Sequence, residues 1–204
     1  GSKDLYYIYY EKAIKGLLIL GVPLSLGLIF LADPIIMTLY GGNFSNAIIA
    51  MQILSMDCLL FFVYMPLGNA LIGLGKEKNV AISTFIGVMM DIILNLLLIP
   101  PFGLAGSAVA TIASEAVILG MFWYYFSSSL KVLPIPRFLG KPILASLPMI
   151  AIVLLVKGNV FLVIPIAMAA YFVTFFFIGG LDEEEETIVR NLIARVKRKI
   201  LRKT

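Results

Sequence analysis

The chain has 204 residues, of which 61% are hydrophobic and 14% charged, with a net charge of +4; soluble domains are about half apolar and about a quarter charged, so a soluble domain is excluded. Because about 20 apolar residues make one helical span, the composition predicts a polytopic, all-α bundle of six transmembrane helices. A single cysteine, Cys58, and no histidine exclude disulfide frameworks, histidine-ligated metals and histidine-dependent catalysis, so we expect no enzyme, no metal and no cofactor.

Residues 1–15 form the first predicted element, an interfacial segment that mixes charged residues with tyrosines. Tyrosine rings suit the headgroup level of a bilayer, and we prefer this interpretation to the alternative that the tyrosines stack on a sugar. The start at Gly1-Ser2, without a methionine or a signal peptide, indicates an expression scar on a fragment.

The apolar run over residues 16–40 predicts the first span. Pro23 lies inside this run, and a proline in a helix leaves a backbone carbonyl without its usual partner. We expect a kink near Pro23, and we expect neighbouring helices or waters to satisfy the carbonyl, so that this helix lines an interior surface.

Three further runs complete a predicted four-helix transporter core, residues 16–126. They carry polar residues in their interiors: Asp57 in the run over 47–74, Asp91 and Asn95 in the run over 80–99, and Thr111 and Glu115 in the run over 104–126. The third run stops at Pro100-Pro101, and the turn to the fourth is short. The third and fourth runs are therefore predicted to be antiparallel neighbours.

A proline-bearing connector, residues 127–142, separates the core from two peripheral transmembrane helices within residues 143–180. Residues 181–204 begin with acids and end with bases, which complements a helix dipole and predicts a cytoplasmic amphipathic basic helix. We expect this helix to lie in solvent or on anionic lipid and not to bind nucleic acid.

The distribution of basic residues predicts the topology. With six spans, fifteen of the 16 Lys and Arg residues fall in segments on one side of the membrane, and only Lys157 falls on the other. Since Lys and Arg are retained in cytoplasmic loops, both termini are predicted to be cytoplasmic in an inner cell membrane.

Three acids lie at the depth of the bilayer midplane. Asp57, Asp91 and Glu115 each fall about ten to twelve residues inside a run, and no basic residue is expected at that depth. A charge at the centre of a span costs about 2.5–3.5 kcal/mol or more unless it meets water, a cation or a proton. We therefore predict that these acids line an ion or substrate pathway.

Polar neighbours extend the acids into two stripes. Asp91 and Asn95 are four residues apart on one helix, and Ser107, Thr111 and Glu115 repeat the same step on the next. Small residues near the turn would let the two helices approach closely. The alternative is that Asn95, Ser107 and Thr111 only join the helices and that a hydroxyl group caps Glu115.

The segment LNLLLIPPFGLAGSAVATIASE, residues 94–115, resembles the C-terminal signature of polysaccharide flippases in the multidrug/oligosaccharidyl-lipid/polysaccharide exporter superfamily. Other family features occur in the same order: a basic helix entry at 12–15, Pro23, the Pro-Ile-Ile at 34–36, the turn at 40–44 and the Gly-Lys at 75–76. The resemblance covers roughly residues 10 to 130.

The resemblance implies a MATE-like carrier of two lobes that moves lipid-linked saccharides across the membrane by alternating access. The six helices here would be its last six, so that the N-terminal lobe would be a missing partner. In such a transporter, we expect Asp57, Asp91 and Glu115 to bind a coupling proton or cation, with support from Asn95 and Thr111. We find none of the cationic cavity residues that family members can use against a pyrophosphate headgroup.

Two alternatives to a saccharide flippase remain. A cation-coupled multidrug exporter of the same superfamily would have the same architecture, and a non-transporting membrane scaffold subunit would need no pathway. An embedded enzyme is disfavoured because the sequence has no histidine and no acid motif at metal spacing.

Overall fold

The computed structural model describes residues 2–129, 135–156 and 159–180. These residues form five α-helices, all long and apolar enough to cross a membrane, and one short 3-10 helix. In chain order they are α1 (Ser2–Leu39), η1 (Gly42–Phe44), α2 (Ala47–Gly73), α3 (Glu77–Ser127), α4 (Ile135–Leu155) and α5 (Val160–Phe177). The described part of the chain contains no strand, which confirms the all-α prediction.

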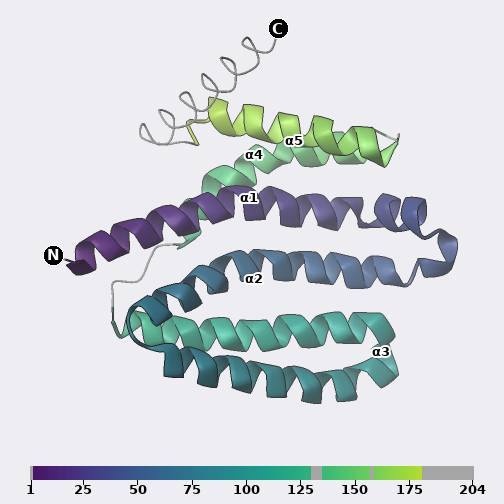
Figure 1. Ribbon diagram of the computed structural model, residues 1–204. Coiled ribbons are helices and arrows are strands. Elements are labelled where there is room, and N and C mark those ends of the chain that lie inside the picture. The colour runs from purple at the N-terminus through teal and green to yellow at the C-terminus, as the bar shows by residue number, and fades with distance from the viewer. Residues whose placement is uncertain (1, 130–134, 157–158, 181–204) are drawn as a thin grey trace, which may run out of the picture.

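Helix α3 is a hairpin of two arms, and it accounts for the difference between five helices and six predicted spans. Gly103 has a non-helical backbone, with φ 57° and ψ −132°, and the arms over 77–102 and 104–127 lie antiparallel on either side of it (Figure 1). The prediction that the third run stops at Pro100 was wrong by three residues. A proline keeps the helical φ and loses only its N–H, whereas Gly103 adopts a positive φ without steric penalty.

Two other boundaries differ from the sequence prediction. Helix α1 runs unbroken from Ser2 through Pro23 and Pro34, so residues 2–15 and the first span form one helix. Helix α4 begins at Ile135, inside the predicted connector, because Pro136 lies in its first turn, where a missing N–H is tolerated. The predicted tail helix over 181–204 and Lys157 lie outside the described residues.

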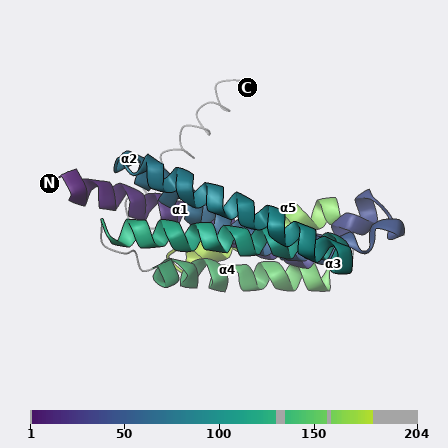
Figure 2. The ribbon, with the colours of Figure 1, turned by 90° about the horizontal axis from the view of Figure 1, so that it is seen from below.

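The helices run along one common axis, and α1 lies in the middle of the bundle (Figures 1 and 2). Helix α1 packs against α2 on one side and against α4 and α5 on the other, and α2 packs against α3. The largest buried cluster joins α1, α2 and the second arm of α3 through Ile14, Leu18, Leu67, Leu71 and Phe122. A second cluster joins α4 and α5 through Ala145, Met149, Ala167, Tyr171 and Phe175.

One hydrogen bond between α5 and α1 satisfies the carbonyl that Pro23 leaves open. In a regular helix the N–H of residue 23 would bond to the carbonyl oxygen of Ile19, and proline has no N–H. The hydroxyl group of Tyr171, which is fully buried, donates to that oxygen over 2.6 Å. The prediction that a neighbouring helix satisfies this carbonyl is confirmed.

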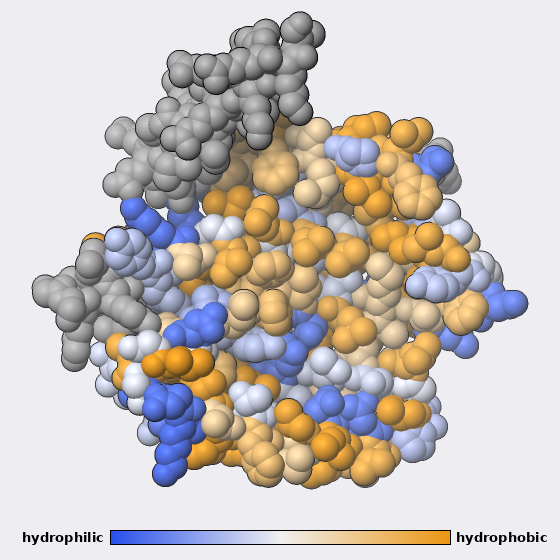
Figure 3. Space-filling model, in the orientation of Figure 1, coloured by the Kyte–Doolittle hydropathy of each residue, from blue (hydrophilic) through white to orange (hydrophobic). Residues whose placement is uncertain are grey.

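Apolar side chains are spread over the face of the bundle that Figure 3 shows. Large side chains that point outward include Leu96, exposed by 72%, and Phe85, exposed by 64%. Apolar patches of this extent are unfavourable in water and fit the hydrocarbon of a bilayer. The chain is therefore a multi-pass membrane protein.

Candidate functional site

Three acids lie at one depth in the α2–α3 part of the bundle. Asp57 follows the first residue of α2 by ten positions, and Asp91 and Glu115 lie twelve positions before and after Gly103. Since α2 begins at the end of the bundle where the α3 hairpin turns (Figure 1), all three lie about 15–18 Å from that end at 1.5 Å per residue. This depth is about half of a hydrocarbon core of about 30 Å.

The three acids come from three different helical arms and meet. The carboxyl groups of Asp57 and Glu115 lie within hydrogen-bonding reach of each other, and Asp91 is near enough for its charge to act on Glu115. Two carboxyl groups can share a hydrogen bond only when one of them carries a proton, because an ionised carboxylate has no donor. The Asp57–Glu115 pair is thus a place that can hold a proton.

Each acid also keeps one carboxylate oxygen without a protein donor. Oδ1 of Asp57, Oδ1 of Asp91 and Oε2 of Glu115 are buried and have no hydrogen-bond partner within the described residues. Buried polar atoms nearly always have a partner, and a charged one without a partner is costly. These oxygens can accept from a proton carrier, water or a cationic group on a substrate.

Tyr64 belongs to the cluster and was not predicted. Its hydroxyl group lies within hydrogen-bonding reach of Glu115, and its ring packs on Phe122 with centroids 6.4 Å apart. Tyr64 follows Asp57 by seven residues, which is two helical turns and the same face of α2. That spacing was the available signal, but a tyrosine in a span reads equally well as part of an aromatic belt.

Close packing of the α3 arms brings Asp91 towards Glu115. A Cβ atom at Gly87 would lie 2.3 Å from Cγ1 of Ile118, and one at Gly106 would lie 2.2 Å from the carbonyl oxygen of Leu98. Gly106, Ala108 and Ala110 are buried, and the close contacts of Gly87 and Gly106 confirm that small residues let the arms approach.

Asn95 and Thr111 are half-buried, and each bonds within its own arm. The side-chain amide of Asn95 donates to the carbonyl oxygen of Asp91 over 2.9 Å, and the hydroxyl group of Thr111 donates to the carbonyl oxygen of Ser107 over 3.2 Å. These bonds join the two side chains to their own helices, and a role for either in the pathway stays a prediction.

The cluster does not have the form of a metal centre. Within the part of the chain that the structure describes, no group of three or more Asp, Glu or Cys side chains is spaced to hold a metal ion. What the geometry provides is a carboxyl pair, a third carboxylate nearby and a phenol.

Comparison with known proteins places the chain in a family. Residues 2–181 match the family described as "Lipid II flippase MurJ". The chain belongs to this family. Membership of the MurJ family agrees with the multi-pass apolar helices and with the resemblance carried by residues 94–115.

Curated relatives of the chain include members named for glycan and polysaccharide biosynthesis. It is 31% identical over 122 residues to the "Probable low-salt glycan biosynthesis flippase Agl15" of Haloferax volcanii, covering 60% of this chain and 26% of that protein. It is 27% identical over 129 residues to the "Capsular polysaccharide biosynthesis protein CapF" of Staphylococcus aureus, covering 61% of this chain and 32% of that protein. The chain thus spans about a quarter to a third of these relatives. No solved structure matches it.

Proposed function

We propose that this chain is the C-terminal part of a transporter that flips lipid-linked oligosaccharide or polysaccharide precursors across the cell membrane by alternating access. The MurJ family match supports a transporter, and the names of the two relatives above support a saccharide-lipid substrate. The chain matches only part of its relatives, so the N-terminal lobe of the same carrier would supply the rest of the substrate cavity.

We base the proposal that the transporter is coupled to a proton or cation on the proximity of the Asp57 and Glu115 carboxyl groups. With one proton between them, the two carboxyl groups attract and draw α2 towards the second arm of α3. Without it, both are negative and repel each other in a medium of low dielectric constant. Asp91 adds a third negative charge to the same region, and Tyr64 can donate to Glu115 in either state. Binding and release of the proton would thereby favour different spacings of the two helices.

We further propose an orientation of the bundle in the membrane and separate roles for its helices. The end of the bundle that carries Lys12, Lys76 and Arg137 would face the cytoplasm, so that both termini are cytoplasmic. The four arms within residues 16–126 would form the transport core, and α4 and α5 would be peripheral to it. Asn95 and Thr111 would line the pathway beside the acids.

The test replaces each acid of the pair by its amide in the complete transporter. Asp57→Asn and Glu115→Gln keep the shape of the side chain and remove its titratable proton. We expect both to lose most of the flipping rate and to flatten its dependence on pH, measured with a fluorescent lipid-linked saccharide in proteoliposomes. Asp33→Asn, at an exposed position on α1, makes the same chemical change outside the cluster and should leave both unchanged.

One outcome would contradict the coupling, one would identify the coupling ion as sodium, and one would contradict the substrate class. Normal flipping with a normal pH profile in both variants would refute a coupling role for the pair. A dependence on a sodium gradient at constant pH, lost in the same variants, would replace the proton by a sodium ion. Transport of cationic drugs in place of saccharide lipids would favour the exporter alternative.

A further inference from the structure

A second polar region lies on the opposite side of α1 from the acid cluster. It is a pocket of about 470 Å³ between the first half of α1, the start of α4 and the end of α5. Four basic side chains line it together with one acid, Glu11; the bases are Lys12, Lys15, Arg137 and Lys141. The volume lies within the range of about 300–1,000 Å³ that ligand pockets commonly have.

Helical spacing aims the bases at one place. Lys12 and Lys15 are three residues apart on α1, and Arg137 and Lys141 are four apart on α4, so that each pair occupies one helix face. The first turn of α4 also lies at the pocket, and the N-terminal end of a helix dipole is positive. The described lining of the pocket therefore carries more positive than negative charge.

The bases of the pocket also make contacts within the protein. Lys141 donates to the carbonyl oxygen of Gly179 over 2.6 Å, at the C-terminal end of α5, and Lys12 and Lys15 also make interactions within the protein. A lysine has three N–H donors and an arginine has five, so such a side chain can bond within the protein and to an anion at the same time. Arg137 is exposed, and its planar fork suits a phosphate group.

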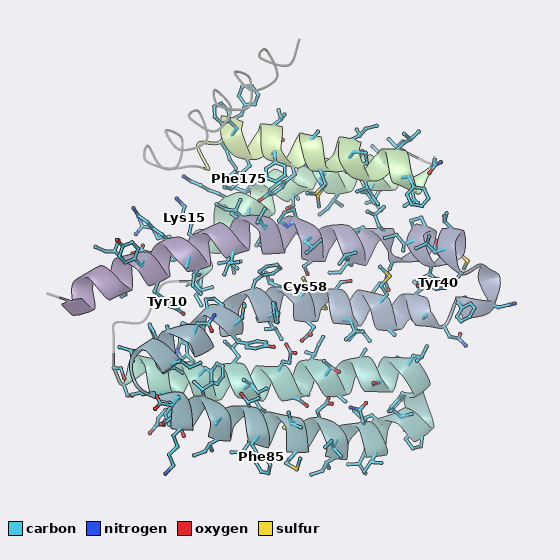
Figure 4. All side chains as sticks on the ribbon, viewed as in Figure 1. Tyr10, Lys15, Tyr40, Cys58, Phe85 and Phe175 are labelled. Atoms are coloured by element: carbon cyan, nitrogen blue, oxygen red, sulfur yellow. The ribbon has the colours of Figure 1, made fainter. Side chains whose placement is uncertain are left out.

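The remaining walls of the pocket are apolar. Ile8, Ile19, Phe138 and Phe175 line the pocket, and Phe175 and Lys15 lie between α1 and α5 in Figure 4. A ligand that fits must combine a negative head with an apolar body. The pocket also lies at the end of the bundle where the basic residues gather, which is the headgroup level of a membrane.

We propose that this pocket binds the phosphate group of an anionic phospholipid from the cytoplasmic leaflet, with Lys12, Lys15 and Arg137 around the phosphate. Lys141 holds the end of α5 in place beside it. The acyl chains lie along the apolar wall formed by Ile19, Phe138 and Phe175. The bound lipid joins α1 to the α4–α5 pair at this end of the bundle, and it is separate from the transported molecule.

The test measures lipid binding to the purified full chain by native mass spectrometry in detergent. We expect phosphatidylglycerol to bind more tightly than phosphatidylcholine. The double variant Lys12→Gln/Arg137→Gln should weaken the binding of phosphatidylglycerol by about 20- to 30-fold, because each basic residue near an anionic headgroup contributes about fivefold to the affinity. Lys76→Gln/Lys78→Gln removes the same charge from the same end of the bundle but outside the pocket, and it should change binding little.

A charge-retaining variant separates binding from folding. Lys12→Arg/Arg137→Lys keeps both charges and should keep most of the affinity, with the same helical content by circular dichroism as the wild type. Equal losses in the pocket variant and in the Lys76/Lys78 control would show general surface attraction and would overturn the proposal.

Three competing anions are tested in the same assay. Displacement of phosphatidylglycerol by millimolar inorganic phosphate would identify a site for free phosphate and overturn the lipid assignment. Preference for a polyprenyl pyrophosphate over phosphatidylglycerol would make the pocket a substrate site and would also overturn it. The third competitor is the acidic run at 182–186, which follows Gly180 in the sequence. Lipid binding that occurs only after these acids are changed to amides would show that the chain itself supplies the anion.

Discussion

At the scale of single residues, Gly106 decides how closely the α3 hairpin can fold. A Cβ atom there would meet the backbone carbonyl oxygen of Leu98 at 2.2 Å, and backbone cannot move aside as a flexible side chain can. We expect Gly106→Ala to destabilise the protein by about 1–3 kcal/mol, the usual cost of overpacking. The measurement is the midpoint of thermal unfolding in detergent.

Gly120→Ala is the matched control for this change. Gly120 lies in the second arm of the same hairpin, and a Cβ atom there would have no heavy atom within 4 Å. Alanine is the better helix former, so its midpoint should stay equal or rise slightly. Equal midpoints for the two variants would mean that the arms are less tightly packed than the structure shows.

The sequence was sufficient to find the acids of the candidate site but not their partners. Asp57, Asp91 and Glu115 stand out because a carboxylate in hydrocarbon is costly wherever the helix faces. Tyr64 does not stand out, because a tyrosine in a span is common and only the fold shows which face of α2 it occupies. The bases of the α1–α4–α5 pocket were missed for a different reason: each pair is visible in the sequence, but the pairs are more than 100 residues apart.

At the scale of helices, the bond between Tyr171 and the carbonyl of Ile19 joins α5 to α1. We expect Tyr171→Phe to lower the free energy of unfolding by about 1–3 kcal/mol, because it leaves a buried carbonyl without a donor. In a Pro23→Ala background the N–H of residue 23 can reach the same carbonyl, so the effect of Tyr171→Phe should shrink. Unfolding in mixed micelles of all four combinations measures the coupling.

Tyr124→Phe removes a hydroxyl group from a tyrosine that is 70% exposed and should have little effect. An equal cost of Tyr171→Phe with and without Pro23 would contradict the assignment of this bond to the proline.

Helix boundaries were predictable only where a residue type forces them. The turn between the α3 arms was placed correctly within residues 100–106, but its position at Gly103 depends on a backbone conformation that two preceding prolines conceal. The start of α4 was missed because Pro136 and Pro142 read as a connector, although a proline in the first turn suits a helix. Pro23 was read correctly as leaving a carbonyl to satisfy, but Tyr171, which satisfies it, could not be chosen from among nine tyrosines.

At the scale of the whole molecule, the proposed orientation can be mapped by cysteine labelling. In a Cys58→Ala background of the transporter in intact cells, Lys78→Cys should be protected from a membrane-impermeant maleimide, and Asn43→Cys should be labelled. Both positions are exposed and lie in or next to turns at opposite ends of the bundle. Labelling at position 78 without labelling at position 43 would invert the topology.

The overall architecture was the part most accessible from sequence. Apolar runs of span length separated by short turns predict a bundle of antiparallel crossings. The described chain begins and ends at the same end of that bundle (Figure 1). The packing order was not accessible. Residues that face lipid and residues that face another helix are both apolar in a membrane protein, so hydropathy does not show that α1 lies between the two helix groups.

The central position of α1 has a mechanical consequence. The substantial contacts between α2–α3 and α4–α5 within the described residues all pass through α1. A rotation of the α2–α3 group relative to the α4–α5 group would therefore have α1 as its axis. Ser25 and Gln52 form hydrogen bonds between α1 and α2, and Tyr171 forms one between α5 and α1. Helix α1 is therefore hydrogen-bonded to both helix groups. Through the contacts of the described residues, a displacement of the lipid-facing α4–α5 pair would reach the acids as a tilt or a turn of this one helix.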